Sequence, residues 1–452
     1  MRSASQRSGQ MRIGWKGRTL DASVASFRYR VLSPVRLLRS RGHEVELFDE
    51  SRLDAYDAVV FSKTYAAPDI AVAQRLRRRG REVVFDVCDN HFYNPYRLPA
   101  YFKARDDQLR MLELCTRVVC STPALARTLW VQAGLSQLPQ VVGDIIEADQ
   151  IAAPPLGAHP ATVSLLWFGL HGSPNAPAGM LDLLSIAPLL LDAAARFSFE
   201  LVVVSNSRKK FEQHIEPLRL TTRYVEWSPE ALQREIAAAR AVLIPLSNNP
   251  FVACKTHNRL TLALAAGKPV VADVIESYRE FAPYVWLSSW EAGLQAVLGD
   301  DPAPSAQRLG MAAAYLRAYW SDAEIARQWE RALGLAQAAD EPPDVASISG
   351  GLVRLDEAFV GSVDLEVPAT DLQVELMANG QAVAAAPLDL PTAQRRKNGA
   401  VRLVESGGFF IPASAVPLPD QAYVRYTTRL QRSQEPVAGA LVDVHTRPPP
   451  AL

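Results

Sequence analysis

Residues 237–272 read A-A-A-R-A-V-L-I-P-L-S-N-N-P-F-V-A-C-K-T-H-N-R-L-T-L-A-L-A-A-G-K-P-V-V-A. Their pattern predicts a buried strand at 241–245, a polar loop, a short helix and a second buried strand from Pro269. Gly267 is expected just after the last helical turn, and Pro269 prevents the helix from continuing. A strand, a helix and another strand in this order are typical of a parallel sheet covered by helices.

The start of this helix carries a polar cluster formed by Lys255, Asn258 and Arg259. A helix N-terminus has unpaired N–H groups and the positive end of the helix dipole. Adding Lys and Arg there makes a binding site for an anion, most simply a phosphate or a diphosphate. The alternative is a solvated helix entrance with no ligand. The position of the cluster favours a ligand, because open α/β sheets bind ligands at the carboxyl ends of their strands.

With 452 residues, the chain is too long for one ordinary core, so two or three domains are expected. Its 48 basic and 48 acidic residues balance, which disfavours a nucleic-acid-binding role. No apolar run approaches the roughly 20 residues that a membrane-spanning helix needs. The start lacks the apolar region of a secretory signal. The four cysteines lack CxxC spacing and stand in apolar or strand-like surroundings, which is typical of reduced thiols in or near a core. We therefore predict a cytoplasmic globular protein.

Strand and helix patterns alternate over two stretches of the chain. In residues 11–150, apolar strands such as 83–87 alternate with amphipathic helices such as 102–114. The proline-bearing segment 151–159 interrupts this series and is interpreted as a linker. A second alternating series follows in residues 160–338. The sequence therefore predicts an α/β protein with two doubly wound, Rossmann-like domains at these ranges.

The pattern changes after the proline-bearing joint D-E-P-P-D at 340–344. From 345 to 452, short runs alternate apolar and polar residues and show no helical period. One such run is centred on Asn379-Gly380, a dipeptide that strongly favours a β-hairpin. We predict an all-β accessory module, similar to a β-sandwich, at 345–452.

Several nucleotide-binding and catalytic motifs are absent from the sequence. No G-x-G-x-x-G turn follows a strand, which disfavours a dehydrogenase. The chain also lacks a Walker loop, an H-E-x-x-H zinc motif and a Ser-centred nucleophile elbow. No D-x-D element stands where the end of a strand would present it to a ligand. We therefore assign no metal ligands and no cofactor.

Several segments resemble GT-B glycosyltransferases, in particular the bacterial enzymes of retaining group 1 (family 4-like). In the second series, the resemblance is carried by W-F-G-x-x-x-S-P-N at 167–175 and K-T-H-N-R-L-T-L-A-L-A-A-G-K-P-V-V-A at 255–272. In the first series, it is carried by F-R-Y-R-V-L-S-P-V-R-L-L-R-S-R-G-H-E-V-E-L at 27–47 and F-D-V-C-D-N-H-F at 85–92. The all-β region resembles β-sandwich modules that follow some bacterial polysaccharide-assembly glycosyltransferases.

The resemblance implies a metal-independent, hexosyl-type glycosyltransferase of bacterial surface-polysaccharide assembly. It implies a nucleotide-diphospho sugar, UDP- or GDP-linked, held by the second domain, and a glycan or lipid-linked acceptor on the first. A further expectation is a peripheral contact with the inner face of the plasma membrane through the basic run at 75–81. The donor-binding residues that the resemblance implies are Gly169, Asn175, Lys255, Asn258, Arg259 and Gly267.

The first domain supplies the other candidate residues. His91 and Asp89 follow the strand at 83–87 and are the catalytic candidates, His91 against the donor sugar and Asp89 near the acceptor hydroxyl. A capping or packing histidine is the alternative for His91. Arg28 and Arg30 are the candidates for binding the acceptor, and the alternative for both is a surface position on the first helix.

One departure from the family pattern concerns two carboxylates. Many retaining members have glutamates that contact donor ribose and sugar at the positions that fall here on Cys254 and Leu262. Neither a thiol nor a leucine side chain accepts hydrogen bonds as a carboxylate does. The sequence therefore leaves two interpretations, a variant transferase or a non-catalytic GT-B-like protein that binds glycan or scaffolds an assembly.

Overall fold

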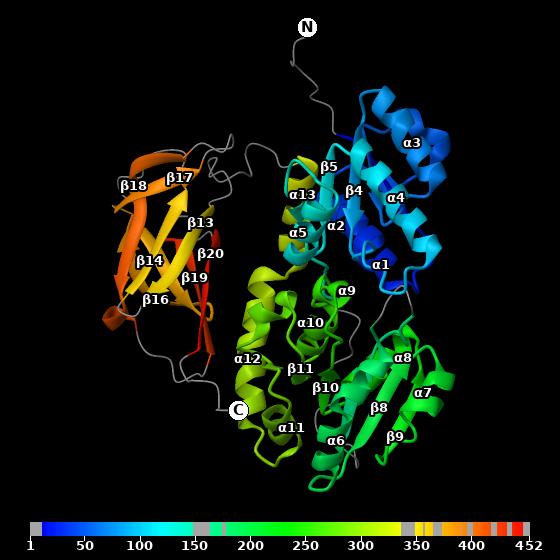
Figure 1. Ribbon diagram of the computed structural model, residues 1–452, viewed down its shortest axis with the longest axis vertical. Coiled ribbons are helices and arrows are strands. Elements are labelled where there is room, and N and C mark those ends of the chain that lie inside the picture. The colour runs from blue at the N-terminus through cyan, green and yellow to red at the C-terminus, as the bar shows by residue number, and fades with distance from the viewer. Residues whose placement is uncertain are drawn as a thin grey trace. The chain divides into compact units, whose positions relative to one another are not determined.

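The computed structural model describes residues 11–147, 163–173, 178–335, 349–355, 358–364, 373–388, 390–395, 401–416, 423–431 and 436–445. The chain forms two compact units, which we call unit 1 (Met1–Leu335) and unit 2 (Ala336–Leu452). Unit 1 contains two sheets (Figure 1): the first half is built on the sheet of residues 13–141, and the second half on that of residues 164–287. Among the helices described, none has both the length and the apolar character needed to cross a membrane.

The first half is a parallel sheet of six strands: β1 (Ile13–Gly17), β2 (Val45–Leu47), β3 (Ala58–Ser62), β4 (Glu82–Val87), β5 (Arg117–Cys120) and β6 (Gln140–Val141). Their order is β2-β1-β3-β4-β5-β6. The central strands are apolar runs buried on both faces, as in β3, where Val59, Val60 and Phe61 are inaccessible to solvent. The connecting helices are α1 (Ala25–Phe27), the π-turn η1 (Arg28–Leu32), α2 (Ser33–Ser40), the 3₁₀ turn η2 (Glu50–Ala55), α3 (Ala67–Arg78), α4 (Pro99–Leu114) and α5 (Pro123–Gln132).

The first helix contains a π-turn that the sequence pattern does not predict. The sequence predicts a kink near Pro34, and the chain is helical on both sides of this residue, as α1, η1 and α2 in succession. Because proline has no N–H group, Pro34 cannot donate to the carbonyl of Arg30, four residues earlier. The indole Nε1 of Trp15 donates to that carbonyl instead, at 2.8 Å.

The second half is also a parallel sheet of six strands: β7 (Ser164–Phe168), β8 (Glu200–Ser205), β9 (Thr222–Glu226), β10 (Ala241–Ile244), β11 (Val270–Ala272) and β12 (Trp286–Leu287). Their order is β12-β11-β10-β7-β8-β9. Its helices are η4 (Met180–Ile186, 3₁₀), α6 (Ala187–Ala194), α7 (Arg208–His214), α8 (Pro229–Ala238), α9 (Pro250–Ala253), α10 (Asn258–Ala265), η5 (Glu276–Phe281, 3₁₀), α11 (Trp290–Leu298) and α12 (Ala303–Tyr319). The chain of unit 1 then ends in α13 (Asp322–Leu333). The two sheets confirm the predicted pair of doubly wound halves.

The last helix, α13, packs on the first half, although it follows the second half in sequence. Trp329 is inaccessible to solvent, and its ring meets that of Trp15 edge-on, with centroids 4.8 Å apart. Ile325 and Ala332 belong to the same apolar core as Ile13, and α13 lies beside α2 (Figure 1). The domain ranges predicted from the sequence remain predictions, and the sequence pattern gives no sign of this crossing.

Unit 2 consists of strands and one short 3₁₀ turn among its described residues, which confirms the predicted all-β module. The elements are β13 (Ser349–Leu355), β14 (Ala358–Asp364), β15 (Gln373–Ala378), β16 (Gln381–Pro387), β17 (Leu390–Arg395), β18 (Val401–Pro412), η6 (Ala413–Ala415), β19 (Tyr423–Leu430) and β20 (Pro436–His445). The strands are hydrogen-bonded in the order β16-β15-β19-β20-β13-β14-β18-β17, and β13 pairs with β20 at Ser349 and Ala438. Asn379 and Gly380 both have positive φ angles and form the predicted hairpin turn.

Candidate functional site

The candidate site lies where the two halves of unit 1 meet, at the carboxyl ends of strands from both sheets. Lys255 precedes α10 in the second half, and Asp89 follows β4 in the first. The Nζ atom of Lys255 lies 2.5 Å from Oδ1 of Asp89, and it also lies 4.3 Å from the centre of the Phe251 ring. A predicted donor-binding residue and a predicted catalytic residue are therefore in direct contact across the two halves.

Asp89 also forms an ion pair with Lys63, the residue that follows β3. Burial raises the pKa of the Asp89 carboxyl, but the charges of Lys255 and Lys63 oppose it, and the net pKa is well below the usual range. The carboxylate is therefore ionised at neutral pH. A carboxylate held this acidic is a weak proton acceptor, so the arrangement favours charge pairing over general-base catalysis in this state.

His91 lies on the same loop as Asp89 and contacts the neighbouring strand end. Its Nδ1 is 2.7 Å from the hydroxyl oxygen of Tyr65. Burial lowers the pKa of His91 to about 4, although the charge of Asp89 acts in the opposite direction. The imidazole is therefore neutral at pH 7, with one nitrogen occupied by Tyr65. A neutral ring of this kind can exchange hydrogen bonds with a sugar hydroxyl.

The second half contributes Arg259 and Gly169, which lie against each other. Nη1 of Arg259 is 3.4 Å from the carbonyl oxygen of Phe168, the last residue of β7. A Cβ atom added to Gly169 would lie 3.3 Å from that Nη1 and 3.2 Å from the ring of Trp167. The absence of a side chain at Gly169 therefore leaves room for the guanidinium at the end of β7.

Asn258 is also at the meeting of the two halves, and Gly267 is not. Nδ2 of Asn258 is 3.4 Å from a carboxylate oxygen of Asp144, which belongs to the first half. Gly267 lies past the other end of α10, with a φ angle of +68° and open space where a side chain would be. Its observed role is to end the helix, as the sequence predicts. Asn175 lies outside the described residues.

The prediction that Arg30 binds the acceptor is wrong, because this arginine is buried and does not reach the surface. It is 1% exposed. Its guanidinium donates to the carboxylates of Asp86 and Asp144, at 2.5 Å and 3.1 Å, and to the carbonyl of Val142 at 2.7 Å. These bonds satisfy its nitrogens inside the first half, so no donor group is left to face an acceptor.

Arg28 is partly buried and faces the second half. Its Nε donates to Glu147 at 2.8 Å, and its guanidinium carbon lies 5.9 Å from the ring centre of Trp227, which follows β9. Desolvation lowers the pKa of Arg28, but its bonds to Glu147 raise it by more, so the side chain stays charged. Of the two arginines, Arg28 is the one that the structure brings near the other half.

The positions that carry glutamates in many retaining transferases are buried in apolar cores. Leu262 is 7% exposed and belongs to the core of the second half. Cys254 is 3% exposed and packs with residues of the first half, including Leu125. Its carbonyl accepts a hydrogen bond of 3.0 Å from Oγ1 of Thr122. Leu262 therefore contributes to the packing of the second half, and Cys254 packs the second half against the first.

Two basic residues near the site are not identified by the sequence analysis. Lys63 has a φ angle of +55°, an uncommon value for a residue with a side chain. Lys210, on α7, donates from Nζ to the carbonyls of Gly172 at 3.0 Å and His171 at 3.5 Å, and so braces the loop that follows β7. The available signal for Lys63 is its place directly after a predicted strand. Lys210 offers no comparable signal.

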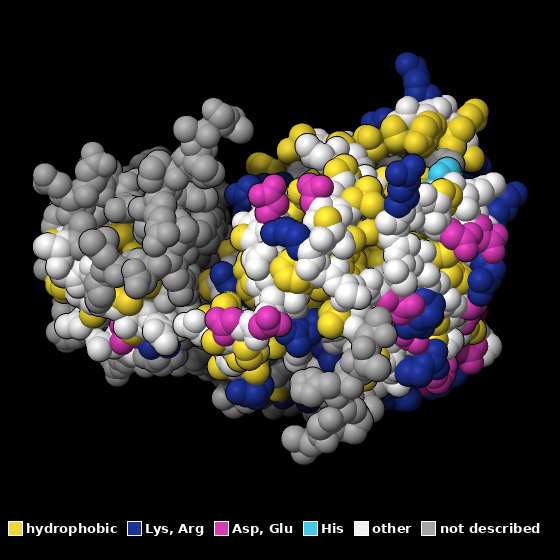
Figure 2. Space-filling view, turned by 90° about the horizontal axis from the view of Figure 1, so that it is seen from below, with side chains coloured by type: hydrophobic (Ala, Val, Ile, Leu, Met, Phe, Trp, Pro, Cys, Tyr) yellow, Lys and Arg dark blue, Asp and Glu magenta, His cyan; other side chains and the backbone are white. Residues whose placement is uncertain are grey.

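Charged side chains of both signs are interspersed on the face of the molecule shown in Figure 2. The basic run at the end of α3 is partly neutralised, because three of its arginines pair with acidic residues of the segment around η2. The pairs are Arg75 with Glu50 at 2.8 Å, Arg79 with Asp54 at 3.1 Å and Arg81 with Asp57 at 2.5 Å.

Within the part of the chain that the structure describes, no three His, Cys, Asp or Glu side chains are grouped to hold a metal ion.

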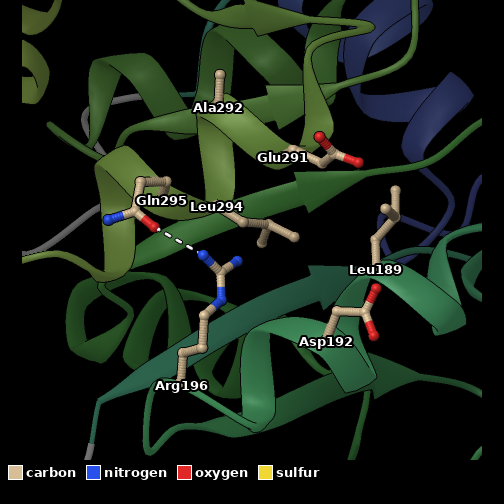
Figure 3. A pocket seen from close by; sticks show the side chains of 7 residues that line it. All are labelled: Leu189, Asp192, Arg196, Glu291, Ala292, Leu294 and Gln295. Atoms are coloured by element: carbon tan, nitrogen blue, oxygen red, sulfur yellow. Dashed lines mark hydrogen bonds between the residues drawn. The ribbon is translucent and has the colours of Figure 1, made fainter.

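A hollow of about 470 Å³ lies between α6 and α11 in the second half (Figure 3). The carboxylates of Asp192 and Glu291 extend from the two helices into it. At its far end, Nη1 of Arg196 donates to Gln295 at 3.2 Å. None of the predicted site residues lines this hollow, so it is separate from the cluster at the strand ends.

Comparison with known proteins assigns the fold. No protein-family model matches the chain, and no curated protein matches its sequence. Among solved structures, HepE from Anabaena, in complex with UDP and glucose, aligns with a TM-score of 0.52 and 15% identity, over 72% of this chain and 100% of its own. Sucrose-phosphate synthase from Thermosynechococcus elongatus aligns with a TM-score of 0.53 and 13% identity, over 73% and 100%. These likenesses confirm the GT-B fold predicted from the sequence.

Proposed function

We propose that this chain is a GT-B glycosyltransferase that moves a sugar from a nucleotide-diphospho sugar to a glycan or lipid-linked acceptor. The observation that carries the proposal is the cluster of Lys255, Asn258 and Arg259 around the start of α10, beside Gly169. The cluster is at the carboxyl ends of β7 and β10, where open α/β sheets bind ligands. HepE has been crystallised with UDP-glucose, which supports a donor of this class.

The chemistry proposed for the second half is stabilisation of the leaving diphosphate. Negative charge grows on that group as the bond to the sugar breaks, and fixed cations lower the energy of the transition state. Lys255, Arg259 and the N-terminus of α10 supply this charge, so the proposed transfer needs no metal ion. Lys210 holds the loop after β7 beside them, through the carbonyls of His171 and Gly172.

The proposed acceptor side is the end of the first sheet, where Asp89, His91 and Tyr65 meet. His91, neutral at pH 7, is proposed to contact the donor sugar or the acceptor. Arg28 remains a proposed acceptor contact, and Arg30 is withdrawn because it is buried. A hexosyl donor, bacterial surface-polysaccharide assembly, a cytoplasmic location and contact with the inner face of the plasma membrane also remain proposals.

A second function, non-catalytic binding of glycan or scaffolding, is favoured by one observation. The two positions where many retaining transferases carry donor-contacting glutamates are Cys254 and Leu262, and both are buried in apolar cores. A protein that keeps the basic cluster but lacks these contacts could bind a diphosphate without transferring a sugar.

A ligand screen with a turnover assay separates these functions. Thermal unfolding is measured with UDP, GDP, UDP-glucose and GDP-mannose, and release of free UDP or GDP is then followed with a mixture of glycan acceptors. A transferase gains stability with one of these nucleotides and releases it from its sugar. Binding without release supports the non-catalytic function. No stabilisation by any of the four would refute the proposal.

A further inference from the structure

Asp89 occupies an unusual place in the candidate site, because it pairs with a lysine from each half of unit 1. Lys63 belongs to the first half and is 19% exposed, whereas Lys255 belongs to the second half and is 36% exposed. The carboxylate itself is 10% exposed. Lys255 is therefore the more accessible of the two lysines, and it is also the one that we assign to the donor.

The two roles of Lys255 are in conflict. An ammonium group has three N–H donors, and one of them is directed at Oδ1 of Asp89, at 2.5 Å. A diphosphate that approaches this lysine either displaces the carboxylate or binds next to it. In both arrangements two negative groups share one cation, and like charges at short range in a partly buried site repel.

We propose that Asp89 sets the affinity of the site for the donor by competing with the diphosphate for Lys255. This inference rests on the proposed function, because it assumes that Lys255 contacts the diphosphate. In this role Asp89 is a positioning residue that acts through Lys255. Donor binding exchanges one anion for another at the lysine.

Lys63 makes this exchange feasible. A buried carboxylate that loses its only cation is strongly destabilised, but Asp89 keeps Lys63 as a partner when Lys255 turns to the ligand. Both groups of that remaining pair belong to the first half, so the pair does not depend on the position of the second. The carboxylate can therefore give up one lysine without becoming an isolated buried charge.

The proposal predicts the direction in which diphosphate binding changes when Asp89 loses its charge, and other roles of Asp89 predict different directions. If Asp89 competes, removing its charge strengthens binding of a diphosphate. If Asp89 instead accepts a hydrogen bond from the donor, removing its charge weakens binding. If it acts only as a base, binding is unchanged and turnover alone falls.

The test is calorimetric titration of the full chain with UDP, GDP and pyrophosphate, and with uridine, which lacks the diphosphate. The main variant is Asp89→Asn, which keeps the size of the side chain and removes its charge. The matched control is Glu276→Gln, because Glu276 also pairs across the two halves, with Arg127, but the pair is about half exposed and outside the basic cluster. The control therefore reports any effect of loosening the two halves.

We expect Asp89→Asn to bind UDP about 10-fold more tightly than the unmodified chain, which corresponds to about 1.4 kcal/mol. Uridine binding and the Glu276→Gln variant should be unchanged. Equal or weaker UDP binding by Asp89→Asn would overturn the inference while leaving the proposed function intact. The absence of UDP, GDP and pyrophosphate binding in both proteins would overturn both.

A second variant covers the case in which Asp89→Asn does not fold because Lys63 is left unpaired. The double variant Lys63→Met, Asp89→Asn removes the buried pair together and keeps the net charge of the site. UDP should still bind more tightly than to the unmodified chain, because Lys255 is released from its competitor. Unchanged or weaker binding by the folded double variant would overturn the inference.

Discussion

Arg259 offers the clearest test of the proposed diphosphate site, because it is not committed to an ion pair across the two halves as Lys255 is. Its guanidinium makes a hydrogen bond of 3.4 Å to the carbonyl of Phe168 and another to the hydroxyl of the buried Tyr278. Lys255, in contrast, pairs with Asp89 and packs over Phe251. Arg259→Ala should lower the free energy of unfolding by only about 1 kcal/mol, the usual net contribution of a hydrogen bond.

The expected loss of binding follows from the type of bond. A charge-assisted hydrogen bond contributes roughly 1.5–3 kcal/mol. Arg259→Ala should therefore weaken binding of UDP or GDP by about 10- to 100-fold. Arg259→Lys should recover only part of the loss, because an ammonium group cannot make the two parallel bonds of a guanidinium.

Calorimetric titration of the folded variants with UDP and GDP measures the change in affinity, and thermal unfolding of the same variants checks that they are stable. Arg317→Ala is the control, because Arg317 is an exposed arginine on α12 with the same charge. If Arg259→Ala binds the preferred nucleotide as tightly as the Arg317→Ala control, Arg259 does not contact the diphosphate. The proposed function would then lose one of its two main cations.

Three further predictions concern stability and organisation. Trp329→Ala should lower the free energy of unfolding by about 3–5 kcal/mol in urea titrations, because the ring is buried against Trp15 and the Arg30 guanidinium; a loss below about 1 kcal/mol would contradict its core role. Burial lowers the pKa of His257 to about 3, so the unfolded chain binds the proton more readily below about pH 6.5 and stability falls as the pH falls. Between pH 7 and 5 this histidine should account for a loss of about 2 kcal/mol, which should be missing in His257→Leu while the loss due to His91 remains. Limited proteolysis should release unit 2 as a fragment whose circular dichroism spectrum is β-rich, and a helical spectrum would refute this prediction.

The sequence predicts the elements whose signals are local. The apolar strands, Gly267 after α10 and the Asn379-Gly380 hairpin each depend on a few neighbouring residues, and the structure contains all of them. The helical stretch from Met180 to Ala194 is divided at Ala187 into η4 and α6, because Pro188 lacks an N–H group. The helical stretch of α12 and α13 is also divided, at Ser321, whose hydroxyl caps α13. Both divisions also have local causes, which are the proline in the first case and the serine in the second.

The parts of the site that the sequence does not predict depend on distant pairings. The sequence presents Arg30 as an acceptor-binding candidate or a surface residue. Only its approach to Asp86 and Asp144, far along the chain, explains its burial. Lys63 becomes relevant only when Asp89 is beside it. A charged residue in a short segment has no signal that separates solvent from a buried partner, because the partner is set by the packing of the sheet.

The crossing of α13 has a consequence for how the chain folds as it is synthesised. Domains usually fold in the order in which they leave the ribosome, the N-terminal one first. Here the core of the first half includes Ile325, Trp329 and Leu333, which are made only after every strand of the second half. The first half therefore keeps part of its apolar core exposed to solvent until α13 has been made, while the second half can complete its fold earlier. Chains truncated before residue 322 should leave the first half sensitive to protease and the second half protected.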